Sequence, residues 1–278
     1  MKRIIFLLVG LCPVLLQAQF NLTLFGGVSN YQGDLQEKRF TTAQSHGAFG
    51  LGIQYDFNPW LSARTNLLYA KVSGDDKFAT DPQLVARNLN FNSRILEGNL
   101  LVEARLFDID RTGFTPYVFA GLAVFGFDPY TKDTVGNTFY LQPYTTEGVA
   151  YKRTQLAFPF GGGIKFKVSD RVLLGYEIGL RKTTTDYLDD LSNRYVDRDE
   201  LLAAKGAIAV ELAYRGDELK NGNPTYPAAG TVRGSAKVKD WYYVQGITLT
   251  YRIRSFSFGN GNGRSRSGNE LACPKNVY

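Results

Sequence analysis

The stretch LEGNLLVEARL, which covers residues 96–106, alternates between two kinds of side chain. Its even-numbered positions are small or apolar, and most of its odd-numbered positions are polar or charged. Because successive side chains of a β-strand point to opposite faces, the stretch predicts a strand with one apolar and one charged face. A soluble sheet with one face in water would show the same alternation, so the rest of the chain must distinguish the two.

The same alternation recurs in segments that are long enough to cross a bilayer. We expect eight strands, at residues 20–30, 46–57, 60–72, 92–107, 115–127, 155–168, 172–184 and 241–254. The fifth of these is apolar on both faces, so its orientation stays open. Repeated segments of this length and alternation are typical of a transmembrane β-barrel with lipid outside and polar side chains inside.

The connections between these strands alternate in length. Those after the first, third, fifth and seventh strands are long, at residues 32–44, 73–91, 128–154 and 185–240. Outer-membrane barrels have short periplasmic turns and long outer loops, and an even strand count leaves both termini in the periplasm. A secreted β-sandwich is the alternative, but it has no reason to place all long loops at one end. The predicted fold class is an all-β, eight-stranded antiparallel transmembrane β-barrel with long extracellular loops.

The last long loop contains a segment, residues 199–214, with apolar residues at near-helical spacing. This spacing predicts a short external helix. Gly206 weakens the prediction because glycine disfavours a helix interior. An extension of the barrel wall is the alternative for this segment.

The chain divides into three parts. Residues 1–18 have a basic start, a short apolar run and a small residue, Ala18, for cleavage, which predicts a signal peptide. Residues 19–258 form the predicted barrel. Residues 259–278 begin with a run of Gly, Asn, Ser and Arg that predicts a flexible periplasmic tail. The predicted location is the outer membrane, with the N- and C-termini in the periplasm.

The composition agrees with a barrel and limits the partners. A mean hydropathy of −0.20 suits a barrel because only alternate strand residues face lipid. The net charge is +6, but no nucleic-acid-binding motif accompanies it, so we expect no nucleic-acid partner. Once the signal peptide is removed, Cys273 is the only remaining cysteine. It is either a free thiol or a disulfide link to a periplasmic partner, because exported compartments are oxidising.

Charged side chains of both signs occupy positions that the alternation directs into the lumen. An eight-stranded barrel is only wide enough for its own side chains to fill. Opposite charges inside it should pair, since an unpaired buried charge is costly. We therefore predict a lumen salt-bridge plug and keep an ion path as the alternative. The predicted plug residues are Arg64, Glu97, Glu103, Arg105, Lys165, Glu177, Arg181 and Arg252.

We predict no enzyme activity, no catalytic residue, no cofactor and no metal site. His46 is the only histidine, and the adjacent Ser45 would point to the opposite face of a strand. The acidic residues between 186 and 200, and the pair Asp75–Asp76, lack the spacing of a known calcium loop. A solvated loop face is the favoured interpretation of both acidic groups, with calcium binding as the alternative.

Four segments resemble one family of outer-membrane barrels. They are GGVSNYQGDL at 26–35, RNLNF at 87–91, TDYLDDL at 185–191 and CPK at 273–275. Together, and in this order, they resemble the PorG-like outer-membrane barrels of the Bacteroidetes.

This resemblance implies a small, non-enzymatic structural barrel of the type IX protein secretion machinery. Such a barrel would tie a periplasmic ring of that machine to the outer membrane. The implied partners are membrane lipid and periplasmic ring proteins, with Cys273 as the candidate contact and no small-molecule substrate. The alternative is a generic surface barrel that binds an external ligand or partner through its long outer loops.

Overall fold

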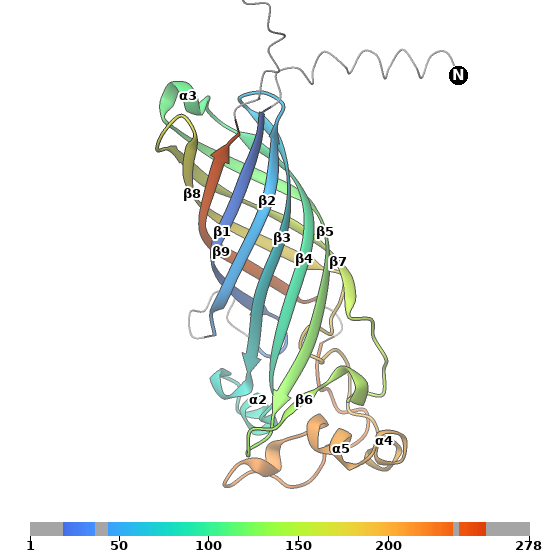
Figure 1. The fold of residues 1–278 in the computed structure, drawn as a ribbon. Helices are drawn as coiled ribbons and strands as arrows, with labels where there is room; N and C mark the ends of the chain where they lie inside the picture. Colours follow the sequence, from blue (N-terminus) through green and yellow to red (C-terminus); the bar gives the residue numbers. More distant parts are fainter. Residues whose placement is uncertain (1–18, 37–43, 236–238, 254–278) are drawn as a thin grey trace, which may run out of the picture.

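The computed structural model describes residues 19–36, 44–235 and 239–253, which form one closed antiparallel β-barrel (Figure 1). The order around the barrel is β4-β3-β2-β1-β9-β8-β7-β5, and pairing of β5 with β4 closes it. The wall strands are β1 (Gln19–Gln32), β2 (His46–Asp56), β3 (Leu61–Asp75), β4 (Asn90–Arg105), β5 (Phe114–Lys132), β7 (Thr154–Lys167), β8 (Val172–Thr183) and β9 (Trp241–Arg252). The predicted fold class is confirmed.

The two ends of the barrel differ. At the turn end, short connections join β2 to β3, β4 to β5 and β7 to β8, and α3 (Ile109–Thr112) lies there (Figure 1). The loop end carries the remaining short elements (Figure 1). These are α2 (Pro82–Arg87), β6 (Thr138–Tyr140), α4 (Arg198–Lys205), α5 (Ala207–Ala213), and the 3-10 turns η2 (Asp76–Phe78), η3 (Gln142–Tyr144) and η4 (Gly216–Glu218). Within the described ranges, no helix has the length and apolar character needed to cross a membrane.

Two strands, β3 and β5, run three or more residues further toward the loop end than the alternation predicts. β3 continues to Asp75, where it pairs with Asn90 of β4. β5 continues to Lys132, where it pairs with Thr138 of the short strand β6. Loop residues cover these extensions, so their two faces no longer separate into apolar and polar, and sequence alternation does not reveal them.

The open orientation of the fifth predicted strand is settled by burial. Along β5, Tyr117, Phe119 and Phe125 point inward and are buried. Val118 and Leu122 point outward and are exposed. Both faces are apolar because the inward one packs in the lumen and the outward one belongs to the apolar outer wall.

The lumen is filled by side chains in two layers. Toward the loop end it is apolar, with Phe91, Ile95, Phe125 and Tyr242 in one buried cluster. Toward the turn end it is polar and charged. The inward positions of β3 show this change, from Val72 toward the loop end to Arg64 toward the turn end.

The helix expected at residues 199–214 is present as two shorter helices. α4 and α5 meet at Gly206, whose φ of 85° and ψ of 175° belong to a region that is open essentially only to glycine. With the break at Gly206, Leu201 of α4 packs with Ala209 and Ala213 of α5 in one small buried cluster.

Candidate functional site

The centre of the polar layer is a carboxylate held by two cations. Glu103, on β4, is completely buried. Its Oε1 lies 2.5 Å from Nζ of Lys165 and 3.0 Å from Nε of Arg105. Arg105 also contacts Asp56 at 2.5 Å, and Lys165 donates to Gln54 at 3.3 Å. These five side chains tie β2, β4 and β7 together from inside.

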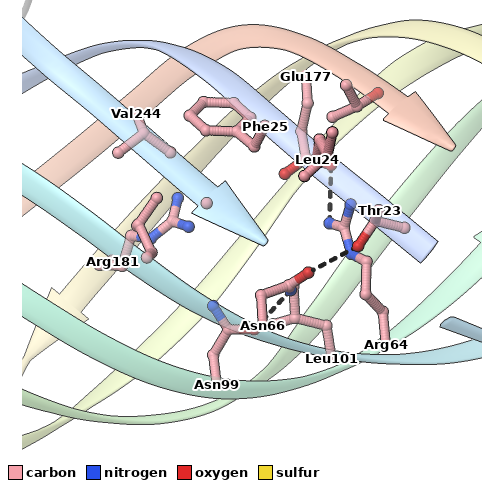
Figure 2. Close-up of a pocket in the computed structure, with 13 residues that line it drawn as sticks. Thr23, Leu24, Phe25, Arg64, Asn66, Asn99, Leu101, Glu177, Arg181 and Val244 are labelled. Atoms are coloured by element: carbon pink, nitrogen blue, oxygen red, sulfur yellow. Dashed lines mark hydrogen bonds and ion pairs between the residues drawn. The ribbon is translucent and has the colours of Figure 1, made fainter. Parts of the chain in front are cut away.

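A second ion pair spans the full width of the lumen. Arg64 Nη2, from β3, lies 2.7 Å from Glu177 Oε2, from β8. In the barrel order these two strands are opposite each other. The hydroxyl of Tyr117 donates to the same carboxylate oxygen at 2.8 Å. Figure 2 shows the pair reaching across the interior.

A third carboxylate, Glu97, links the polar layer to the apolar one. Nε of Arg181 lies 3.2 Å from its Oε2, and the hydroxyl of Tyr242 donates to that oxygen at 2.6 Å. Asn99 donates to its other oxygen at 2.5 Å, and Asn66 donates to Asn99 at 2.8 Å. Every carboxylate of this layer therefore has a cation and at least one further donor.

The hollow left inside this network is small. Among its lining residues are Arg64, Asn66, Glu177 and Arg181, and its volume is about 20 Å³ (Figure 2). Such a volume holds about one water molecule.

The structure brings seven of the eight predicted lumen residues into this network. Arg252 also points inward, but it lies at the turn end and pairs with Asp110 at 2.8 Å. Sequence reasoning missed the neutral and aromatic partners Gln54, Tyr117 and Tyr242. All three occupy inward positions of their strands. Strand parity was the signal for Gln54 and Tyr242, whereas the strand of Tyr117 is apolar on both faces and gave no such signal.

The loop end is closed by a second arrangement, the loop cap, formed by residues 31–36, 87–91, 141–153, 185–235 and 239–240. Leu188 and Leu191 are buried at its centre and pack in one cluster with Tyr31, Leu35 and Phe91. Three of the four segments that carry the family resemblance, residues 26–35, 87–91 and 185–191, meet here. Residues that carry the family resemblance are therefore among those that hold the cap together.

Two buried carboxylates of the cap share one hydroxyl. Tyr31 Oη lies 2.6 Å from Asp189 Oδ2 and 3.0 Å from Asp240 Oδ1. Backbone N–H groups of Leu191 and Leu188 donate to the two carboxylates. Burial, reinforced by nearby carboxylates, raises the pKa of both Asp189 and Asp240 well above the usual range. The pair therefore retains a proton at pH values where exposed aspartates are ionised.

Arginines clamp the cap from two sides. Arg233 donates to Glu147 at 3.0 Å and to the backbone carbonyls of Asp190 and Ala213 at 2.9 and 3.1 Å. Arg87 contacts both carboxylate oxygens of Asp76 at 2.8 Å. Arg87 also donates to the carbonyl oxygen of Arg233, so the two clamps are joined.

The prediction of a solvated acidic loop face is wrong for the residues at its start. Asp186, Asp189 and Asp190 are buried, and so is Asp76. Asp190 accepts from Thr146 at 2.5 Å and from Tyr151 at 2.6 Å, and burial raises its pKa to about 6. They are buried because long-range aromatic, hydroxyl and arginine partners surround them. Within the described ranges, no group of three acidic, histidine or cysteine side chains could hold a metal ion.

The single histidine does not pair with its sequence neighbour. His46 Nε2 lies 2.8 Å from Ser73 Oγ, whereas Ser45 donates to Asn30 at 2.9 Å. His46 and Ser73 line a pocket of about 280 Å³ at the loop end.

The outer wall of the barrel is apolar. Leu51, Leu67, Leu100 and Leu122 each expose between 57% and 62% of their surface. A contiguous apolar surface of this kind on a soluble protein would be a site of association. Here it encircles a closed barrel, which is the surface of a membrane-spanning barrel.

Aromatic side chains mark the turn end of this wall. Phe20 packs edge-on against Tyr55 at 5.1 Å, and Tyr55 against Phe57 at 4.9 Å. On the other side Phe114 contacts Phe107 and Phe166. Aromatic girdles of this kind lie at the membrane interfaces of transmembrane barrels.

Cys273, the predicted signal peptide at 1–18 and the predicted tail at 259–278 lie outside the described residues.

Comparison with known proteins gives a family and several structural likenesses. The profile of a family described as "Domain of unknown function (DUF6089)" matches residues 1–204. No curated protein matches the sequence.

Three similar solved structures illustrate the likenesses. Ail, the attachment invasion locus protein of Yersinia pestis, is 8% identical, with 86% of this chain and 100% of that chain covered and a TM-score of 0.42. Neisserial surface protein A is 10% identical, with coverages of 85% and 99% and a TM-score of 0.41. A major outer membrane protein from Thermus thermophilus is 12% identical, with coverages of 85% and 99% and a TM-score of 0.43.

Proposed function

The chain belongs to the DUF6089 domain family, whose function is unknown, and we propose that it is a non-enzymatic, non-conducting outer-membrane barrel that anchors a periplasmic ring of the type IX protein secretion machinery. The observation that carries the proposal is the filled lumen, which Arg64 and Glu177 bridge from opposite walls at 2.7 Å. A barrel filled in this way works through its outer wall and its two ends.

The turn end is the proposed side of ring contact. Asn21 of β1 pairs with Arg252 of β9, so the chain enters and leaves the barrel at the same end. Ile253, the last described residue, therefore lies at the turn end, and Cys273 follows it in the sequence. The resemblance of four segments to the PorG-like barrels supports the assignment of this end to the periplasm.

A disulfide from Cys273 tests the ring contact in intact cells. Cells that produce the full chain are treated with a thiol-blocking reagent and their membranes are run on a non-reducing gel. We expect a slower band that collapses on reduction and is absent from the Cys273→Ser variant. Mass spectrometry of that band should identify a periplasmic protein of the secretion ring. A band that shifts equally in wild type and Cys273→Ser would remove this contact from the account.

The second candidate function is a surface barrel that binds an external partner through its outer loops. The loop cap favours it, because its buried clamps make the long loops a folded platform. The backbone N–H of Gly230 donates to the carbonyl of Tyr195 at 2.8 Å, so the two ends of the segment between them lie side by side. Residues 197–228 can therefore be replaced by a short linker. Protein secretion is measured in cells that carry this replacement and in cells whose chain is truncated after residue 258. If the replacement abolishes secretion and the truncation leaves it intact, the surface-barrel function is preferred to the anchor function.

A further inference from the structure

Cations gather on the outside of the wall at its loop end. Lys71 of β3, Arg94 of β4 and Asp128 of β5 are neighbours in register across three strands. Arg153, just before β7, lies 3.0 Å from Asp128. This group, the basic belt, holds three cations and one carboxylate. Its net positive charge faces outward at the edge of the apolar wall.

Two cations of the basic belt lie over the same aromatic ring. Nζ of Lys71 lies 6.0 Å and Cζ of Arg94 lies 5.8 Å from the centre of the Tyr130 ring. Arg94 and Arg153 remain exposed. Their charges are therefore positioned by the barrel and still free to meet an anion.

Two adjacent hollows lie in the wall beside the belt. The first, of about 320 Å³, is lined by Arg94 and Arg153 together with Tyr69, Leu96 and Gly126. The second, of about 620 Å³, is almost wholly apolar. Leu67, Gly98, Val124 and Leu156 are among its lining residues. Along each strand, the second hollow begins one outward-facing position beyond the first.

Two glycines make the wall hollow. A Cβ added at Gly126 would meet no atom within 4 Å, and one added at Gly98 would meet only a Leu67 methyl group at 3.8 Å. The packing of the barrel therefore requires neither glycine. Glycine weakens a strand, and it often marks a place where a ligand comes close to the backbone.

We propose that the basic belt and the two hollows form a binding site for a phosphorylated glycolipid of the lipid A class. The belt would bind the phosphate groups and the apolar hollow would hold acyl chains. The site lies where the apolar wall meets the polar loop end, which is the depth of lipid headgroups. Basic pockets at that depth recognise phosphorylated headgroups. A hollow that spans β2, β3, β4, β5 and β7 suits a lipid with several chains.

The choice of lipid A rests on the proposed function, because that function turns the loop end toward the outer leaflet. The site itself is tested without the secretion ring. The full chain is reconstituted in phosphatidylcholine nanodiscs, and increasing amounts of lipid A or of phosphatidylglycerol are added. Native mass spectrometry then counts the lipid molecules that the released barrel retains.

Two variants remove the site and two matched variants leave it in place. Arg94→Glu with Arg153→Glu reverses the belt, and Gly98→Leu with Gly126→Leu fills the hollows. The matched controls are Arg111→Glu, at the turn end, and Gly26→Leu, at another outward glycine with no atom within 4 Å of its Cβ position. Heat-modifiable mobility on gels confirms that each variant is folded.

We expect the wild type and both controls to retain lipid A in preference to phosphatidylglycerol. Both site variants should bind it at least about tenfold more weakly. The first loses two surface cations, and in the second leucine side chains occupy the space for the acyl chains. Equal retention by the site variants and the wild type would overturn the site. Equal or stronger retention of phosphatidylglycerol by the wild type would overturn the lipid A assignment. Neither result depends on Cys273, so failure of the ring contact and failure of the lipid site are distinguishable.

Discussion

Arg64 and Glu177 are 113 residues apart in the sequence and meet at 2.7 Å from opposite walls of the barrel. Both side chains are at most 5% exposed. An ion pair that bridges the lumen cannot coexist with an open channel at that level. It also makes the two walls interdependent, since either charge left alone would be buried without a partner.

Removing one member of this pair should destabilise the barrel strongly. For Glu177→Ala we expect the free energy of unfolding to fall by about 3–5 kcal/mol, because Arg64 stays buried and unpaired. The double variant Arg64→Met with Glu177→Leu should recover most of the loss, since no charge remains. Urea titration of the barrel in lipid vesicles measures all three proteins.

An exposed ion pair is the control for this prediction. Arg111 lies 3.2 Å from Asp108, but its side chain is 87% exposed. Arg111→Ala should therefore change the unfolding free energy by less than about 1 kcal/mol. If Arg111→Ala and Glu177→Ala lowered the free energy of unfolding by similar amounts, burial of the lumen pair would not explain the loss of stability.

The loop cap should be more stable in mild acid than at alkaline pH. Burial raises the pKa of Asp190 to about 6, above that of an exposed aspartate, so the folded cap binds a proton that the open cap releases. This stabilisation is complete below about pH 4 and is lost as the pH rises through 6. Between pH 5 and pH 8 the opening equilibrium should increase about tenfold. Asp186, whose pKa burial raises to about 6, acts in the same direction.

Hydrogen exchange of residues 185–195, corrected for the intrinsic rate at each pH, measures this opening. Asp190→Asn keeps one acceptor oxygen and places an NH2 donor against the other hydroxyl, whose oxygen can accept from it. The amide does not titrate, so the pH dependence of this variant should be clearly weaker. A cap that opens more readily at pH 5 than at pH 8 would show that Asp190 is ionised in the folded state.

Gly206 should be required for the bend between α4 and α5. A Cβ at this position meets no atom within 4 Å, so a substitution acts through the backbone alone. Gly206→Ala should cost about 1–3 kcal/mol because the φ and ψ angles there are nearly restricted to glycine. Hydrogen exchange in both helices should then become faster.

The exposed α4 position Ala204 gives the comparison for this variant. Ala204→Ser should cost only about 0.5 kcal/mol, the difference in helix propensity. If Gly206→Ala instead slows exchange in both helices, α4 and α5 have fused and the bend is not needed.

The strands could be predicted because their signal is local. Alternation along residues 96–106 reports directly on lipid outside and a filled lumen inside. The charged residues Glu103 and Lys165 could be assigned to the lumen for the same reason. Tyr117 could not be assigned, since its strand is apolar on both faces and only the closed barrel shows which face is inside.

The loop cap was not predictable from the sequence because its contacts are long-range. Tyr31 and Asp240 are 209 residues apart and meet at 3.0 Å. Asp189 and Asp190 resemble a solvated acidic run in sequence, yet both are buried. Their burial depends on hydroxyl donors and arginines from other loops, and no local sequence pattern indicates these partners.

The filled lumen implies a barrel that is closed to ions and acts through its surfaces. Conductance of the purified full chain in a planar lipid bilayer tests it most directly, with a porin as the positive control and protein-free vesicles as the negative one. We expect no unitary current steps from the folded barrel, because the hollow between the lumen ion pairs is about 20 Å³. Stable steps whose size scales with salt concentration would contradict it.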